Sequence, residues 1–200
     1  QFYITILRKF YHVLKKKRIN KFYYIGGNDS SDSLRIISQY SRQKGYNLQC
    51  IHVPKTIDND LVYNDHTPGF GSAAKYVAQL FSGINFDVRS LPGVYIGVVM
   101  GRHAGFLTAS SSLLRSKGSD GPHLIFIPEF SFNIKEFIKN INSVFNKYGR
   151  CVIAVSEGIK DKNNILYTKK IQSSNEYDDH GNIQLSGSGM LGDFLALSLI

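Results

Sequence analysis

The stretch from Val53 to Asp60 carries several side chains that can do chemistry. It reads Val-Pro-Lys-Thr-Ile-Asp-Asn-Asp, which places Lys55, Asp58 and Asp60 within a few residues of one another. A lysine can hold a phosphate, a carboxylate can take a proton from a hydroxyl group, and two carboxylates can ligate a divalent cation. A simple turn needs none of these groups, so the stretch predicts a site that binds or converts an anionic ligand.

A glycine-rich stretch, Gly26-Gly-Asn-Asp-Ser-Ser-Asp32, is a second candidate site. It follows an aromatic run at 22–25, typical of a buried strand, and precedes residues 34–41, which have helical spacing. A glycine turn between a strand and a helix suits phosphate, because the backbone can approach the anion and the first N–H groups of the helix point at it. A tight turn before a capped helix gives the same pattern, so the residues alone leave both interpretations open.

Two further apolar runs end in polar residues. The run 94–99 is followed by Met100-Gly-Arg102, and the run 151–155 by Ser156-Glu-Gly158. A guanidinium group binds phosphate through two parallel hydrogen bonds, so Arg102 suits an anion, and an arginine that pairs with a structural carboxylate is the alternative. Ligands of open α/β sheets bind where the strands end, and we therefore expect these residues at one sheet edge.

The elements that must position these residues alternate along the chain. This order is typical of an α/β fold with a parallel sheet and helices on both faces. Asp65, Thr67 or Ser72 is expected to cap the helix at 73–81. The expected strands are 22–25, 48–53, 94–99, 124–127 and 151–155, the expected helices are 2–18, 34–41, 73–81, 107–114, 134–148 and 190–199, and a polar loop is expected from 160 to 184.

Composition and charge bound the class of protein. The chain has 200 residues, 42% apolar and 20% charged, which describes a soluble globular protein with one substantial core. Its net charge of +9 favours anionic partners, such as phosphorylated metabolites, nucleic acid or membrane surfaces, without choosing among them. No apolar stretch approaches the ~20 residues that span a bilayer. The two cysteines, Cys50 and Cys151, indicate buried thiols in a reducing compartment, and no histidine or cysteine has zinc-site spacing to His103.

Five motifs, in this order, resemble the phosphofructokinase family and in detail its diphosphate-dependent branch. They are Gly26-Gly-Asn-Asp-Ser30, Pro54-Lys-Thr-Ile-Asp-Asn-Asp60, His66-Thr-Pro-Gly-Phe-Gly-Ser-Ala-Ala-Lys75, Met100-Gly-Arg102 and Ser156-Glu-Gly158. The resemblance runs from about residue 20 to the end of the chain and implies a three-layer, Rossmann-like α/β fold. It also implies reversible phosphorylation of fructose 6-phosphate at the C1 hydroxyl group, giving fructose 1,6-bisphosphate, with inorganic diphosphate as donor and Mg²⁺ as cofactor.

The resemblance assigns roles to individual residues. Asp58 matches the family's general base, which takes the proton from the C1 hydroxyl group, and Lys55 and Asp29 join it as catalytic positions. The implied contacts with the sugar phosphate are Thr56, Ile57, Asp58, Met100, Gly101, Arg102 and Glu157, those with diphosphate are Gly27, Asp29 and Lys55, and those with the metal are Asn28 and Asp60.

Asp29 decides the donor within this resemblance. Relatives that use ATP have glycine at this position, which leaves space for the α-phosphate, whereas the bulk and charge of Asp29 exclude the nucleotide. Lys55 fits the same interpretation, because in this family it can hold pyrophosphate. The chain departs from the pattern of many relatives in two places. Asn28 replaces an aspartate and can ligate Mg²⁺ only through an uncharged oxygen, and no arginine stands near Gly93, where Arg89 is the nearest.

The resemblance implies that this chain is the central part of an enzyme. Residues of about 1–85 would end the donor-binding half, and residues of about 86–200 would form the sugar-phosphate-binding half. The family's glycine-rich donor loop would precede Gln1, and its phosphate-clamping loops would follow Ile200. We therefore expect residues 1–200 alone to have little activity. The full-length protein is expected to be a cytoplasmic homo-oligomer, a dimer or tetramer, without nucleic-acid or membrane partners.

Three alternatives stay open at this point. An ATP-dependent 6-phosphofructokinase is the nearest enzyme alternative. A non-catalytic phosphofructokinase-like subunit or fragment is a different class, against which the complete set of Asp58, Asp60, Arg102 and Glu157 argues. A nucleic-acid-binding module predicts basic residues interleaved with aromatic ones, and only the first expected helix offers that pattern.

Overall fold

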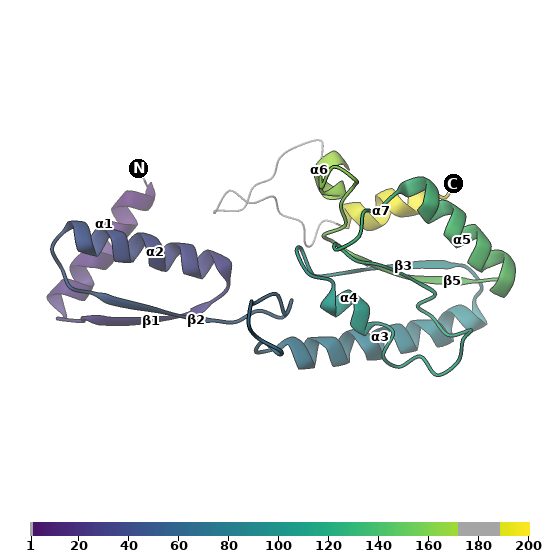
Figure 1. Cartoon of the computed structure of the whole chain (residues 1–200), viewed down its shortest axis with the longest axis horizontal. Coiled ribbons are helices and arrows are strands. Elements are labelled where there is room, and N and C mark those ends of the chain that lie inside the picture. The colour runs from purple at the N-terminus through teal and green to yellow at the C-terminus, as the bar shows by residue number, and fades with distance from the viewer. Residues whose placement is uncertain (1, 172–188) are drawn as a thin grey trace. The chain divides into compact units, whose positions relative to one another are not determined.

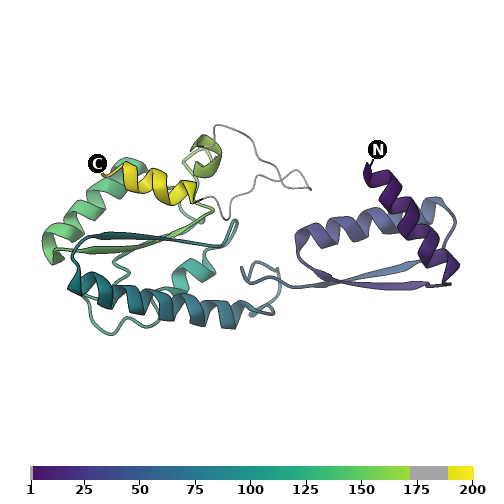
Figure 2. The ribbon, with the colours of Figure 1, turned by 180° about the vertical axis from the view of Figure 1, so that it is seen from behind.

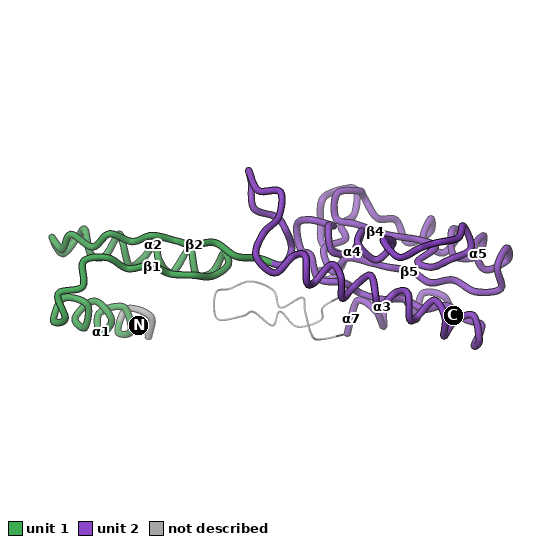
Figure 3. The backbone as a smooth tube through the Cα atoms, turned by 90° about the horizontal axis from the view of Figure 1, so that it is seen from below, with its two compact units in different colours: residues 1–56 green, residues 57–200 purple. Residues whose placement is uncertain are grey.

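The chain divides into two compact units, residues 1–56 and residues 57–200 (Figure 3). The structure is a computed structural model that describes residues 2–171 and 189–200. Each unit has its own parallel sheet and its own helices.

The first unit is a two-stranded parallel sheet with two helices against one face (Figure 1). Strands β1 (Lys21–Gly26) and β2 (Gln49–Pro54) pair along their whole length, with Gly26 opposite Pro54. Helix α2 (Asn28–Gln43) connects the two strands, as parallel pairing requires, and α1 (Phe2–Lys16) packs beside it. The side chains of Leu14 and Leu34 are buried between these elements.

The opposite face of this sheet is apolar and exposed. Side chains alternate along a strand, and the pairs Tyr23–Ile51 and Ile25–Val53 share one side of the ladder. Tyr23 is 58% exposed and Ile25 is 70% exposed, and Ile51 and Val53 are exposed as well. In the described part of the first unit, helices therefore cover only one face of the sheet.

The second unit is a three-layer arrangement around a parallel sheet in the order β3-β5-β4 (Figure 2). Its central strand is buried on both faces: Val152 and Ala154 of β5 pack with α3 and α4, while Ile153 and Val155 pack with α5 and α7. Such double burial explains the uninterrupted apolar run of β5. The elements are β3 (Val94–Val99), β4 (Leu124–Phe126), β5 (Cys151–Ser156), α3 (Phe70–Ser90), α4 (Phe106–Ser110), α5 (Ile134–Tyr148), α6 (Tyr167–Ile171) and α7 (Met190–Leu197).

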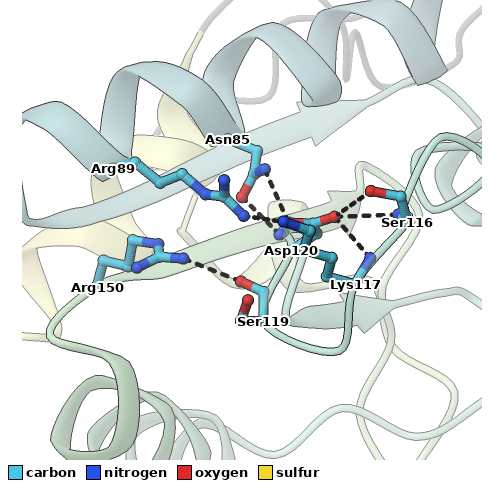
Figure 4. A network of polar contacts seen from close by, with 8 residues as sticks. Asn85, Arg89, Ser116, Lys117, Ser119, Asp120 and Arg150 are labelled. Carbon is cyan, nitrogen blue, oxygen red and sulfur yellow. Dashed lines mark hydrogen bonds and ion pairs between the residues drawn. The ribbon is translucent and has the colours of Figure 1, made fainter.

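A polar network closes the segment between α4 and β4 (Figure 4). The carboxylate of Asp120 accepts hydrogen bonds from the backbone N–H groups of Ser116 and Lys117, at 3.0 and 2.8 Å, and forms an ion pair with Arg89 of α3. Asn85, one helical turn earlier on α3, accepts a hydrogen bond from the Gly121 N–H group at 2.8 Å. The network therefore holds the segment that leads into β4 against helix α3.

The α/β class and the parallel pairing are confirmed, and several details of the prediction were wrong. The strands pair within a two-stranded sheet in the first unit and a three-stranded sheet in the second. Helix α2 already begins at Asn28, α3 spans 70–90 instead of 73–81, and α4 ends at Ser110 instead of 114. The stretch expected to be a loop contains the short helix α6, and its residues 172–184 lie outside the described residues.

The predicted cap of α3 is also corrected. Its N-cap is Gly69, with φ of 95°, and not Asp65, Thr67 or Ser72. A left-handed φ suits glycine, and it turns the chain sharply into the helix. Here the backbone turn replaces the expected side-chain cap.

The two cysteines differ in environment. Cys151 is fully buried in β5, and burial raises the pKa of its thiol to about 12. Cys50 of β2 is only partly buried, contrary to the expectation of a buried thiol. No helix within the described ranges combines the length and the apolar character that crossing a membrane requires.

Candidate active site

The glycine stretch of the first unit joins the end of β1 directly to α2. A β-carbon built on Gly26 would overlap the side chain of Ser30, in the first turn of the helix. Only glycine therefore lets this turn pack so closely against the strand end. Gly27 is the N-cap of α2 and has no side chain with which to cap the helix, while Asp29 lies within the first turn. The predicted strand, turn and helix start are thus present.

Lys55 lies beside this helix start. Its N–H group donates to the carbonyl oxygen of Gly26 at 3.1 Å, which continues the pairing of β1 with β2. Its ammonium nitrogen is 4.0 Å from the position that a β-carbon on Gly27 would occupy. The N-terminus of a helix carries a partial positive charge, so the two features together favour a small polyanion. The first unit brings together Gly27, Asp29 and Lys55, the residues assigned to the diphosphate, with Asn28 next to them.

Asp58 lies in the second unit and is partly buried. The backbone N–H group of Arg102 donates a hydrogen bond to its carboxylate. Burial, followed by the negative charge of Asp60, raises the pKa of Asp58, while His103 and the Arg102 N–H and guanidinium groups lower it again in part. A carboxylate whose pKa is raised toward neutrality is a better proton acceptor for a hydroxyl group than an ordinary surface aspartate.

Glu157 completes this group from the end of β5. It is 9% exposed, and its Oε1 atom accepts a hydrogen bond from the Gly101 N–H group at 3.4 Å. Burial is the main reason that the pKa of Glu157 is raised; the charge of Asp58 raises it further, and Arg102 lowers it. Asp58, Arg102 and Glu157 therefore lie close enough for their charges to act on one another. The structure brings together three of the residues that the sequence assigned to the sugar phosphate.

The loop that carries Arg102 has an unusual backbone. Gly101 has φ of 135°, and a β-carbon there would lie 2.5 Å from the Ala104 carbonyl oxygen. The Ser156 hydroxyl group donates to the Gly101 carbonyl oxygen at 2.6 Å. Met100 precedes this turn with 47% of its surface exposed, so its side chain is accessible to a ligand.

Asn59 is a residue whose role the sequence did not reveal. It is 6% exposed, its Oδ1 atom accepts the Thr67 N–H group at 2.9 Å, and its Nδ2 atom donates to the Asp65 carbonyl oxygen at 3.1 Å. Its φ of 60° puts the backbone in the left-handed region, which asparagine tolerates better than most residues. The sequence signal that could have revealed this role was its position between two aspartates, a few residues before the polar stretch 64–67. Asn59 thus shapes the loop that presents Asp58 and Asp60.

Ile57, which the resemblance assigned to the sugar phosphate, also packs against the core. Its side chain packs against the core formed by α3, and a β-carbon on Gly69 would lie 3.0 Å from its Cγ2 atom. This contact anchors the chain directly before Asp58. Thr56, the remaining residue assigned to the sugar phosphate, ends the first unit.

The carboxylates of this loop suit Mg²⁺ better than a metal that needs a complete set of protein ligands. No group of three or more histidine, cysteine, aspartate or glutamate side chains among the described residues could hold a metal by itself. Mg²⁺ commonly uses one or two carboxylates and takes its other ligands from water and substrate phosphates. Asp58 and Asp60, whose charges interact, fit this second type of site. Asn28 belongs to the other unit and offers an uncharged oxygen.

The chain is similar to known proteins over nearly its whole length. The family model described as phosphofructokinase matches residues 3–195. The chain is 56% identical over 188 residues to the pyrophosphate–fructose 6-phosphate 1-phosphotransferase of Rhodospirillum rubrum, covering 94% of this chain and 46% of that protein. It is 39% identical over 188 residues to the enzyme of the same name from Xanthomonas campestris, covering 92% of this chain and 44% of that protein.

Among solved structures, the pyrophosphate-dependent phosphofructokinase of Nitrosospira multiformis is similar to this fold. It aligns with a TM-score of 0.67 and 40% identity over 80% of this chain and 41% of that one. The chain therefore spans less than half the length of these relatives.

Proposed function

This chain belongs to the phosphofructokinase family, and we propose that its protein transfers a phosphoryl group reversibly from inorganic diphosphate to the C1 hydroxyl group of fructose 6-phosphate. The observation that carries the proposal is the group formed by Asp58, Arg102 and Glu157 in the second unit. Phosphoryl transfer depends chiefly on positioning and on neutralising charge, and a carboxylate, a guanidinium group and a second carboxylate around one loop supply both.

In this proposal Asp58 is the general base. Its carboxylate is held by the Arg102 N–H group and has a raised pKa, foremost because of burial. It accepts the proton of the sugar hydroxyl group as that oxygen attacks the phosphorus atom. The Arg102 guanidinium group binds phosphate oxygens, and Glu157 accepts hydrogen bonds from sugar hydroxyl groups, with Thr56, Ile57, Met100 and Gly101 lining the sugar phosphate.

The first unit supplies the donor site. Gly27 admits the diphosphate to the helix N-terminus, and the Lys55 ammonium group neutralises its charge. Residues 1–56 contain 11 lysines and arginines against two aspartates, whereas residues 57–200 contain 13 basic and 13 acidic residues. The whole positive excess therefore belongs to the unit to which we assign the polyanionic donor. The assignment of donor binding to about 1–85 and sugar binding to about 86–200 is part of the same proposal.

Mg²⁺ is the proposed cofactor, with Asp60 and Asp58 as the carboxylates that would hold it or its water shell, and with Asn28 as a further candidate. When bound, the cation neutralises the negative charge of the phosphates. The proposed setting is the cytoplasm and the proposed assembly a homo-oligomer. An ATP-dependent reaction is the second candidate, and the charge of Asp29 in the first turn of α2 is the observation that disfavours it.

The test is a coupled assay of fructose 6-phosphate phosphorylation with diphosphate or ATP as donor, on the protein as its gene encodes it. We expect turnover with diphosphate and Mg²⁺ that falls by about 10²- to 10⁴-fold in Asp58→Asn. Asp65→Asn, an exposed carboxylate of the same loop, is the matched control and should keep its activity. Near-normal turnover by Asp58→Asn would rule out its role as the base, and turnover with ATP alone would favour the second candidate. Residues 1–200 alone should show little turnover.

A further inference from the structure

The peptide group between Gly101 and Arg102 is held from both sides. Its carbonyl oxygen, which belongs to Gly101, accepts a hydrogen bond from the Ser156 hydroxyl group at 2.6 Å. Its N–H group, which belongs to Arg102, donates to the Asp58 carboxylate. A peptide group is planar and resists rotation, so its orientation at the carbonyl end also sets its orientation at the N–H end. Ser156 and Asp58 are thereby connected through one rigid group.

Ser156 itself has little freedom. It is fully buried at the end of β5, where it pairs with Val99 of β3. Its oxygen accepts the Gly158 N–H group at 3.0 Å, which leaves the hydroxyl hydrogen to point at the Gly101 carbonyl oxygen. The hydrogen bonds thus run in one direction, from Gly158 through Ser156 to Gly101, and then from Arg102 to Asp58. Hydrogen bonds arranged in such a chain strengthen one another.

We propose that Ser156 is a positioning residue for the phosphoryl transfer: its hydroxyl group orients the Gly101–Arg102 peptide group, and this peptide group holds the Asp58 carboxylate in the direction from which it meets the substrate hydroxyl group. This inference rests on the function proposed above. Ser156 does not contact substrate in this scheme and acts only through the peptide group. A base must lie within hydrogen-bond reach of the proton that it takes, and a displacement of about 1 Å can cost on the order of 10²-fold in rate.

The test compares Ser156→Ala with Ser111→Ala in the protein as its gene encodes it. Ser111 is a matched control, because it is also buried, at 2% exposure, and its hydroxyl group donates to the Thr108 carbonyl oxygen at the same distance of 2.6 Å. The first measurement is kinetic. In Ser156→Ala we expect kcat to fall by about 10- to 100-fold while KM for diphosphate stays within about twofold, since the donor site lies in the other unit. In Ser111→Ala both constants should stay within about twofold.

The second measurement needs no turnover. With ¹⁵N-arginine labelling, the exchange rate of the Arg102 amide hydrogen reports how firmly its N–H group is held. We expect this rate to rise about tenfold or more in Ser156→Ala and to stay unchanged in Ser111→Ala. Ser156→Cys, which nearly keeps the shape but has a weak donor, should give the same change if Ser156→Ala does not fold.

The outcomes separate this inference from the proposed function. Unchanged Arg102 exchange in the Ser156 variants would overturn the positioning role, even if the wild-type protein uses diphosphate. An equal loss of kcat in Ser111→Ala would also overturn it, because a general loss of packing would then be sufficient. If the wild-type protein lacks diphosphate-dependent turnover, the proposed function fails. The exchange of the Arg102 amide hydrogen still decides whether Ser156 holds the N–H group that donates to Asp58.

Discussion

Gly158 packs directly against Arg102, so closely that a β-carbon on Gly158 would overlap the Arg102 carbonyl oxygen and lie 2.6 Å from that of Gly101. The end of β5 therefore supports the loop after β3 by backbone contact as well as through Ser156. Both carbonyl groups belong to the loop that carries the Arg102 side chain and the N–H donor to Asp58. The space around Gly158 is fixed by backbone atoms, which cannot move aside as a flexible side chain would.

Gly158→Ala should therefore damage the site. We expect it to lower the free energy of unfolding by about 1–3 kcal/mol, the usual cost of overpacking, and to lower turnover on the order of 10²-fold. Gly83→Ala is the contrasting control. Gly83 lies within α3 with nothing near its β-position, so alanine there should stabilise the helix by about 0.5–1 kcal/mol. Urea unfolding and the coupled assay measure both effects, and a Gly158→Ala protein with normal turnover would contradict the described packing.

The donor prediction concerns Asp29. This carboxylate lies in the first turn of α2, next to the N-cap at Gly27, where a longer donor such as ATP would place its α-phosphate according to the family resemblance. Asp29→Gly removes both its bulk and its charge. We expect the ratio of kcat/KM for ATP to that for diphosphate to rise by about tenfold or more, an effect of about 1.4 kcal/mol.

Asp32→Gly controls for a general effect of the substitution on α2. Asp32 lies one turn further along the helix, is exposed and pairs with Arg35. Its replacement should leave the donor ratio unchanged, although it costs some helix stability. If both variants changed the ratio equally, the selectivity would not depend on the position of Asp29.

The sequence predicted the ends of the strands better than the way the loops are held. The apolar runs of β3 and β5 and the glycines after β1 were enough to place Arg102, Glu157 and Asp29 at strand ends, because local pattern decides these elements. The hydrogen bond from Ser156 to the Gly101 carbonyl oxygen joins residues 55 positions apart, and no local pattern contains it. Asn59 was overlooked for a related reason: its partners at 65 and 67 become neighbours only when the chain turns through its left-handed backbone.

The division into two sheets could not be read from the strand order either. An alternating sequence of strands and helices predicts parallel pairing, but it does not say which strands become neighbours. The exposed apolar face with Tyr23 and Ile25 could not be predicted for the same reason. The apolar run of β1 predicts a strand that is buried on both sides, and it does not say which elements cover each side.

The network around Asp120 predicts a sensitivity to strong acid. Hydrogen bonds from the backbone N–H groups of Lys117 and Ser116, together with the nearby Arg89, hold the pKa of Asp120 well below its usual range. A group whose pKa is lower in the folded state stabilises the fold above its unfolded pKa of about 3.9, and this contribution is lost as the pH falls through the folded pKa. Figure 4 shows the bonds that protonation would weaken.

Asp120→Asn should therefore lower the urea midpoint at neutral pH and flatten the loss of stability below about pH 4. The amide replaces one acceptor oxygen by a donor, which in either orientation faces other donors: the Ser116 and Lys117 N–H groups on one side, or the Arg89 guanidinium and Asn85 amide groups on the other. Asp87→Asn, at an exposed position of α3, serves as control. A neutral-pH midpoint that is equal to wild type in Asp120→Asn would show that the network does not stabilise the unit.

His123 predicts a second and separate pH dependence, in mildly acidic solution. Its Nδ1 atom accepts the Val152 N–H group at 2.9 Å, so the folded state requires the neutral ring. Burial, followed by the charge of Arg150 and with a smaller effect of Arg115, lowers the pKa of His123. The unfolded chain takes up the proton first as the pH falls below about 6.5, and the free energy of unfolding then decreases until the folded pKa is reached.

His123→Gln separates this effect from the titration of the other histidines. The glutamine oxygen can accept the Val152 N–H group but does not titrate. Between pH 7.5 and 5.5 we expect the urea midpoint of the wild type to fall more than that of His123→Gln, whereas His12→Gln, at an exposed position of α1, should follow the wild type. The same difference should be visible as faster intrinsic-rate-corrected exchange of the Val152 amide at pH 5.5 in the wild type. If His123→Gln loses as much stability as the wild type over this range, the neutral ring of His123 does not control it.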